Sequence, residues 1–268
     1  MPTDRPAQPP ADPADAGFWS ELRRRAALGG FLLAVALAAV PLTRLFNGAP
    51  SPAPGVSASA PHDAPAGASR ARRVPVIADF GSEPASREAR VVAGWSLFTG
   101  DNKERPVVII DKREAKVFVF SPTGELLGAA PALLGLAHGD DTVPGIGERP
   151  IADVRPEERT TPAGRFVAEP GVNAGGEDVV WVDYDAAVSM HRVRPLVKAE
   201  RRLERLASAT PEDNRISYGC INLPPAFYEN VVSRAARAGA VIYVLPENGT
   251  PEQLFGAWYF EGATLAKR

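Results

Sequence analysis

The apolar residues of this chain fall mostly into short runs of the kind that form strands. Short runs rich in Val, Ile and aromatic side chains, bounded by turn residues, are typical of buried strands. Strands are therefore expected at residues 107–110, 116–120, 126–136, 165–168, 179–184, 187–191 and 240–245. Residues 111–114 are charged and separate the first two runs, which predicts a β-hairpin.

Three segments instead carry apolar residues at helical spacing. Residues 86–97 predict a short helix that Gly100 ends. Residues 195–208 predict an amphipathic helix, and residues 224–238 predict another, with prolines at its start and Gly239 at its end. The apolar side of the second helix is made by Leu196, Leu203 and Leu206. The whole pattern predicts a mostly β domain decorated by helices, an α+β fold.

An apolar segment near the N-terminus is long enough to cross a bilayer. Residues 26–43 are uncharged and follow three arginines, Arg23 to Arg25. A helix of this length spans about 27 Å, close to the thickness of a hydrocarbon core. We therefore expect a transmembrane anchor over residues 26–46, with its basic flank in the cytoplasm and the rest of the chain exported. A buried core helix, or a signal peptide cleaved near residues 57–60, is the alternative.

The residues after this anchor have the composition of a tether. Within residues 47–75, 21 of 29 residues are Ala, Pro, Gly or Ser, so the stretch cannot bury enough apolar surface to offset its ordering entropy. The predicted organisation is a disordered cytoplasmic tail (1–25), the anchor (26–46), a disordered tether (47–75), a segment with the short helix (76–105) and one main folded domain (106–268).

Composition and charge exclude several classes of protein. Residues 1–75 carry eight basic and five acidic side chains, and the remainder carries 22 basic and 27 acidic ones. An acidic main body argues against nucleic acid as a partner. The chain has one cysteine and three histidines, so it can form neither an internal disulfide nor a cysteine-rich zinc site.

The lone cysteine, Cys220, lies in the segment Ser217-Tyr218-Gly219-Cys220-Ile221-Asn222-Leu223-Pro224, between a polar loop and the predicted helix 224–238. A cysteine just before a helix N-terminus feels the positive end of the helix dipole, which favours the thiolate. Gly219 lets the backbone approach a substrate, and successive amides at such a turn can stabilise an oxyanion. The alternative is a buried cysteine that acts as a small hydrophobic residue.

A thiol nucleophile also needs a proton acceptor, which is normally a histidine. His62 lies in the predicted tether and His138 in a polar loop, so both are expected to be solvated. His191 ends the strand predicted at 187–191 and precedes Cys220 by 29 positions. It is the candidate base, although a histidine at a strand end is often only structural.

These residues resemble the active-site pattern of the YkuD family of L,D-transpeptidases. That pattern is a histidine, a spacer, then Ser or Thr, His, Gly, Cys, a hydrophobic residue, and Asn or Arg. The matching residues are His191, Ser217, Gly219, Cys220, Ile221 and Asn222. Residues 107–112 resemble the opening strand of the family, and residues 161–166 resemble its Thr-Pro-x-Gly-x-Phe turn. The resemblance covers roughly residues 107–245.

The chain departs from the family pattern at two points. Tyr218 stands where the motif has its histidine, and the spacer after His191 is longer than usual because of the basic segment around residues 198–205. Tyrosine keeps a ring and a hydrogen-bond donor, but its pKa of about 10 prevents it from acting as a base near pH 7. Base function therefore falls on His191.

The resemblance implies a YkuD-like domain whose Cys220 thiolate attacks a peptidoglycan stem tetrapeptide, expels the terminal D-amino acid and passes the acyl group to an amine. His191 would transfer the proton, and the amides of Gly219 and Cys220 would hold the oxyanion. Substrate binding would fall to Ser217, Tyr218, Arg215 and Asn222. Arg201, Arg202 and Arg205 suit the carboxylates of diaminopimelate stems, although a solvated face is the default for such a run. No metal or organic cofactor is needed.

Two other functions remain open from the sequence. A hydrolase on the same fold would use the same Cys220 and His191, with water replacing the acceptor amine. A catalytically silent peptidoglycan-binding module would explain Tyr218 and the long spacer. The predicted partners are stem peptides and the cytoplasmic membrane, with the catalytic domain in the periplasm or cell-wall space.

Overall fold

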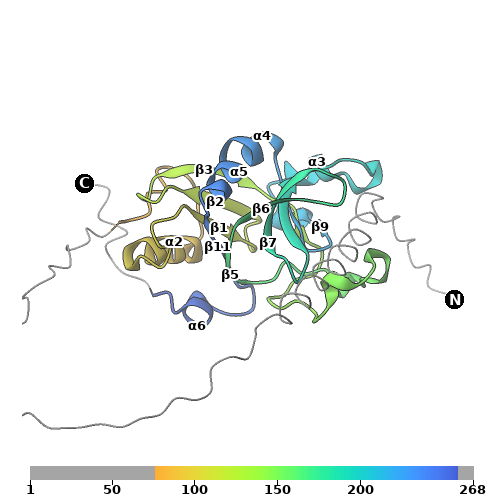
Figure 1. Cartoon of the computed structure of the whole chain (residues 1–268), viewed down its shortest axis with the longest axis horizontal. Helices are drawn as coiled ribbons and strands as arrows, with labels where there is room; N and C mark the ends of the chain where they lie inside the picture. The colour runs from red at the N-terminus through yellow and green to blue at the C-terminus, as the bar shows by residue number, and fades with distance from the viewer. Residues whose placement is uncertain (1–75, 259–268) are drawn as a thin grey trace, which may run out of the picture. The chain divides into compact units, whose positions relative to one another are not determined.

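The computed structural model describes residues 76–258, which form two packed sheets and a short strand pairing (Figure 1). The five-stranded sheet has the order β3 (Leu126–Pro131), β2 (Lys116–Phe120), β1 (Val107–Asp111), β11 (Val241–Val244) and β5 (Gly164–Val167). The four-stranded sheet has the order β10 (Ile221–Leu223), β8 (Val188–Arg192), β7 (Asp178–Asp183) and β6 (Glu169–Val172). The remaining pair joins β4 (Leu134–Gly135) to β9 (Arg215–Ser217).

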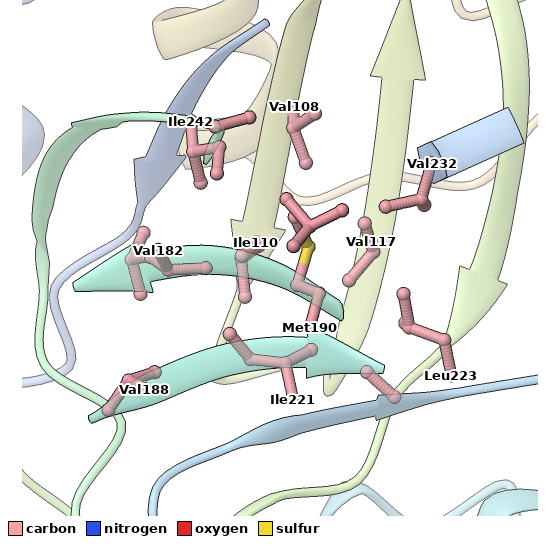
Figure 2. Close-up of a cluster of buried hydrophobic side chains, with 14 of the residues drawn as sticks. Val108, Ile110, Val117, Val182, Val188, Met190, Ile221, Leu223, Val232 and Ile242 are labelled. Carbon is pink, nitrogen blue, oxygen red and sulfur yellow. The ribbon is translucent and has the colours of Figure 1, made fainter. Parts of the chain in front are cut away.

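The main hydrophobic core lies between the two larger sheets. Because side chains alternate along a strand, every second residue of each sheet points into this space. Figure 2 shows Val108, Ile110, Val117 and Ile242 from the five-stranded sheet facing Val182, Val188, Met190, Ile221 and Leu223 from the four-stranded sheet. All of these residues are buried, so the two sheets meet through apolar side chains at this place.

A helix covers the opposite face of the five-stranded sheet. Helix α2 (Arg87–Thr99) is capped by Ser86, whose Oγ accepts a hydrogen bond from the Ala89 amide, and it ends at Gly100 in the left-handed conformation. Its apolar residues form a second core with alternate residues of β1, β2 and β11. The central strand β1 is therefore buried on both faces, which explains its uninterrupted apolar run.

Most predicted elements are present at the expected places. Strands β1 and β2 form the predicted antiparallel hairpin, and β5, β7, β8 and β11 match the other runs. The helix expected at 224–238 consists of α4 (Pro225–Phe227), a π-helical turn (Tyr228–Val232) and α5 (Ser233–Arg237), before Gly239 at φ 72°. The remaining helix, α6 (Pro251–Phe255), follows β11. Single 3₁₀ turns occur at Ile146–Glu148, Ile151–Asp153, Pro156–Glu158, Lys198–Glu200 and Pro211–Asn214.

Two predicted elements differ from the structure, and one strand of the structure was not predicted. The strand expected at 126–136 is divided into β3 and β4, and strand β6 was not predicted. The amphipathic helix expected at 195–208 is reduced to a 3₁₀ turn and the short helix α3 (Arg202–Leu206), because Arg201 adopts a left-handed conformation at φ 51°. Leu196 and Leu203 are exposed, and only Leu206 of the predicted apolar side is buried.

The predictions for the N-terminal tail, the membrane anchor and the tether concern residues outside 76–258 and stay predictions. Within 76–258, no helix is both long enough and apolar enough to cross a bilayer. The same range holds no cluster of His, Cys, Asp and Glu side chains suited to a metal ion.

Candidate active site

The outer face of the four-stranded sheet brings the predicted nucleophile and base together. Strands β8 and β10 are parallel, with Ile221 opposite Met190 and Asn222 opposite His191. Since Met190 and Ile221 point into the core, their chain neighbours Cys220, Asn222, Ser189 and His191 point to the other face. Neighbouring strands lie about 4.8 Å apart and two residues rise about 6.6 Å, which separates the Cα atoms of Cys220 and His191 by about 8 Å.

The Cys220 thiol is partly exposed at the start of β10. It donates a hydrogen bond to the carbonyl oxygen of Ala187 at 3.6 Å, and its Sγ lies 3.8 Å from Ser189 Oγ. Cys220 thus leads into a strand, and the helix α4 begins only at Pro225. The prediction that a helix N-terminus favours the Cys220 thiolate is therefore wrong.

His191 is held as a neutral imidazole. Its Nδ1 lies 2.8 Å from the carbonyl oxygen of Arg192, a contact in which the ring donates, so the lone pair resides on Nε2. Desolvation of the partly exposed His191 ring, helped by the nearby Arg194 and Arg202 guanidinium groups and opposed by the Arg192 carbonyl, lowers its pKa to about 4. At neutral pH the ring is therefore uncharged, and its Nε2 can accept a proton.

Asn222 links His191, the candidate base, to the backbone of Cys220, the candidate nucleophile. Its Nδ2 lies 3.5 Å from His191 Nε2 and donates to the carbonyl oxygen of Cys220 at 3.3 Å. Its Oδ1 accepts a hydrogen bond from Arg202 Nη1 at 2.7 Å, and Arg202 is paired with Glu200 at 2.5 Å. Asn222 has no exposed surface and Arg202 is also buried, so both residues position the site. The solvated face expected for Arg202 is therefore wrong, whereas the substrate contact predicted for Asn222 stays a prediction.

The turn before Cys220 is fixed by its own hydrogen bonds. Ser217 Oγ donates to the carbonyl oxygen of Cys220 at 2.6 Å and accepts the Gly219 amide at 3.1 Å. The Gly219 amide therefore already has an acceptor in this structure, and its role as an oxyanion donor stays a prediction. Ser217 is buried and shapes the turn, and the substrate contact predicted for it stays a prediction.

Gly219 cannot be replaced by a larger residue without rearrangement of this turn. Its φ is +126°, and a Cβ atom would lie 2.7 Å from the carbonyl oxygen of Thr160. Thr161 Oγ1 also donates to the carbonyl oxygen of Gly219 at 2.8 Å. The segment around Thr160 and Thr161 thus packs directly on the turn formed by residues 217–220, which we call the nucleophile turn.

Tyr218 contacts an arginine that the sequence did not single out. The Arg159 guanidinium carbon lies 3.9 Å from the centre of the Tyr218 ring, and the ring also packs against the main core. Tyr218 is partly exposed, and its role in substrate binding stays a prediction.

Arg215 belongs to a different cluster. It is buried, pairs with Glu247 and donates to the carbonyl oxygen of Lys112 at 2.8 Å. Lys112 is itself buried and donates to Asp140 at 3.0 Å and to the carbonyl oxygen of Thr161 at 2.9 Å. Arg215 is therefore part of a buried cluster that stabilises the fold, and the substrate contact predicted for it stays a prediction.

The structure thus brings Cys220, His191, Asn222, Ser217, Tyr218 and Gly219 into one region. Ser189, Arg159 and Thr161 were not among the predicted site residues, and Arg202 was expected on a solvated face or at the carboxylates of the stem peptide. Thr161 was within reach, since it opens the Thr-Pro motif at 161–166. The positions of Ser189 and Arg159 depend on strand register and loop packing, which no local motif records.

The comparisons with known proteins give similarity in structure alone, since no family model and no curated protein matches the chain. The catalytic domain of an E. faecium L,D-transpeptidase matches with 16% identity and a TM-score of 0.32, over 53% of this chain and 98% of that one. Mycobacterium tuberculosis L,D-transpeptidase 1 matches with 18% identity and a TM-score of 0.28, over 52% of this chain and 61% of that one. The helical cell shape determining protein Pgp2 from Campylobacter jejuni matches with 15% identity and a TM-score of 0.35, over 55% and 49%. This chain resembles L,D-transpeptidases in structure. The chain covers 61% of the Mycobacterium tuberculosis protein and 49% of Pgp2, so it matches about half to three fifths of each.

Proposed function

We propose that the chain is an L,D-transpeptidase that forms a cysteinyl acyl-enzyme with a peptidoglycan stem tetrapeptide. The observation that carries this proposal is the placement of Cys220 and a neutral His191 on one face of two paired strands. Ser189 and Asn222 lie beside them on the same face, at 3.8 Å from Cys220 Sγ and 3.5 Å from His191 Nε2 respectively. A thiol and an unprotonated imidazole are the two groups that acyl transfer through a thioester requires.

In the first half-reaction, Cys220 Sγ bonds to the carbonyl carbon of the donor and its proton passes to His191 Nε2. The bond from this carbonyl to the terminal D-amino acid then breaks, and the imidazolium returns the proton to the leaving amine. Because the pKa of His191 is about 4, the resting imidazole is neutral and can take the thiol proton. At rest the thiol donates a hydrogen bond to the Ala187 carbonyl oxygen.

In the second half-reaction an acceptor bonds to the thioester carbonyl carbon while His191 Nε2 takes the acceptor's proton; the C–S bond then breaks and the proton passes to the released Cys220 sulfur. An amine acceptor gives a new peptide bond, whereas water gives a shortened stem, so the acceptor separates a transpeptidase from a hydrolase.

The test is to incubate the full chain with a purified tetrapeptide muropeptide and to identify the products by mass. Cross-linked dimers support the proposal, tripeptide stems alone support a hydrolase, and unchanged substrate supports the silent binding module. Cys220→Ala and His191→Gln are expected to lose the product. His138→Gln is the matched control, because His138 is exposed and contacts Glu212 and Glu247 instead. Loss of product in His138→Gln as large as in His191→Gln would contradict the role of His191 as the base.

A further inference from the structure

The arginines around the site differ in how their charge is balanced. Arg192 pairs with Asp178 and Glu229, Arg194 with Glu177, Arg202 with Glu200, and Arg215 with Glu247. Among the residues that the structure describes, no carboxylate pairs with Arg159, whose contacts are to Val154 and Tyr218.

The acidic neighbour of Arg159 in the chain does not balance its charge. Glu158 turns its carboxylate to Arg149 at 3.1 Å and to Arg155 at 3.0 Å, and it is 7% exposed. These two guanidinium groups lower the pKa of Glu158 to about 2, so its single negative charge is shared between two other arginines. The positive charge of Arg159 therefore stays unbalanced within residues 76–258.

Two contacts fix the orientation of the Arg159 guanidinium. Nε and Nη2 both donate to the carbonyl oxygen of Val154, at 3.3 Å and 3.1 Å, which occupies one edge of the group. The Tyr218 ring lies against its face at 3.9 Å. The other edge keeps one N–H of Nη1 and one of Nη2, the pair that binds a carboxylate in a bidentate manner. The side chain is partly exposed, so a ligand can reach this edge.

The backbone next to Arg159 holds this group beside the nucleophile. Thr160 and Thr161 follow Arg159 directly and pack on Gly219, through the close approach of the Thr160 carbonyl and the hydrogen bond from Thr161. Tyr218, the other contact of Arg159, stands two residues before Cys220. Since a peptide extends about 3.3 Å per residue, a ligand group one or two residues from the reacting carbonyl falls within reach.

We propose that Arg159, held in place by Tyr218 and Val154, binds a carboxylate of the acyl donor and makes the site selective for donors that carry it. The proposal rests on the proposed function for the identity of the donor. Two carboxylates of a stem tetrapeptide have the required chemistry: the C-terminal carboxylate of the departing D-amino acid and the side-chain carboxylate of diaminopimelate. Tyr218, at the position of the family's histidine, thereby acquires a function as the platform for Arg159.

The experiment measures binding without turnover. Dissociation constants are determined in a Cys220→Ala background of the full chain for three synthetic tetrapeptides: the free acid, the C-terminal amide, and the diaminopimelate side-chain amide. One of the two amides is expected to bind about tenfold or more weakly than the free acid, which identifies the carboxylate. Equal binding of all three peptides would overturn the proposal.

Substitutions then assign this selectivity to Arg159. Arg159→Gln is expected to bind the free acid and the discriminating amide equally. Arg155→Gln removes the same charge from the same loop but leaves Arg159 in place, and it is expected to keep the preference. If Arg159→Gln keeps the preference, or Arg155→Gln loses it to the same degree, the proposal is wrong.

Variants of Tyr218 test whether its ring holds Arg159 in place. Tyr218→Phe retains the ring face and is expected to keep the preference, whereas Tyr218→Leu is expected to reduce it. Equal effects of the two substitutions would show that the ring does not hold Arg159 in place.

The binding and acylation measurements separate this inference from the proposed function. Selective binding without acylation of the unsubstituted protein would refute the proposed function and leave the carboxylate site standing. Acylation of the unsubstituted protein together with peptide binding that does not depend on Arg159 would refute the carboxylate site and leave the proposed function standing.

Discussion

His191 makes the site sensitive to acid through a single side chain. Its folded-state pKa of about 4 lies below the ordinary value of 6.5, so the unfolded chain binds more protons between these two pH values. The corresponding stability is fully present above pH 6.5 and is lost as the pH falls toward 4. Between pH 7 and pH 5 this loss amounts to about 2 kcal/mol.

The measurement is the free energy of unfolding by denaturant at pH 7 and at pH 5. His191→Gln is expected to show a smaller decrease than the unsubstituted protein by about 2 kcal/mol, because glutamine does not titrate. His138→Gln should retain the decrease. An unchanged pH dependence in His191→Gln would show that the ring is not buried as a neutral group.

Two adjacent arginines provide a matched pair at the same scale. Arg202 is buried between Glu200 and Asn222, whereas Arg201 is exposed. Arg202→Leu leaves a buried carboxylate and a buried amide oxygen without this partner, which should cost about 3 kcal/mol of stability. Arg201→Leu should cost less than about 0.5 kcal/mol. Denaturant midpoints check the difference, and equal values would contradict the buried role of Arg202.

At the scale of elements, the short helix α3 shows why pattern alone fails in this region. The leucines at 196, 203 and 206 have helical spacing, but the left-handed Arg201 separates the first from the other two. Leu206 packs on Leu133 and Val193, and Leu203 is 52% exposed. Leu206→Ala should therefore destabilise the protein by about 2–3 kcal/mol, and Leu203→Ala by less than about 0.5 kcal/mol. Similar decreases in thermal stability for the two variants would favour the amphipathic helix predicted at 195–208 instead.

The turn between β9 and β10 makes a prediction about activity. Gly219→Ala introduces a Cβ atom against the Thr160 carbonyl at a φ that side chains rarely adopt, which should cost about 1–3 kcal/mol and displace Cys220. Gly145→Ala is the control, since Gly145 has φ +71° but nothing within 4 Å of the added atom. Product formation from the tetrapeptide should fall strongly in Gly219→Ala and persist in Gly145→Ala. Full activity of Gly219→Ala would show that the turn can relax without cost.

The sequence predicted the elements that depend on local signals and missed those that depend on pairing. The apolar run of β1 and the cap and stop of α2 are local, and both are present as expected. The burial of Ser217, Arg215 and Asn222 depends on which strands become neighbours. Polar residues next to a nucleophile therefore suggested substrate contacts, which stay predictions, and packing makes them supports of the turn and the base.

At the scale of the whole molecule, the three layers explain why the site has its present position. Helix α2 covers one face of the five-stranded sheet, and the four-stranded sheet covers the other, so the remaining polar face of β8 and β10 is directed away from both cores. The buried Lys112 connects the end of the hairpin β1–β2 to Asp140 and to the Thr161 carbonyl. The central sheet and the nucleophile turn are thus joined by consecutive hydrogen bonds.

The central claim is that Cys220 becomes acylated, and the intact mass of the protein tests it most directly. After a short incubation of the full chain with excess tetrapeptide and no acceptor, the account predicts an added mass equal to the tetrapeptide less its terminal D-amino acid. Cys220→Ala should show no such adduct. An unchanged mass of the unsubstituted protein under conditions where Cys220 reacts with a thiol reagent, or an equal adduct on Cys220→Ala, would contradict the account.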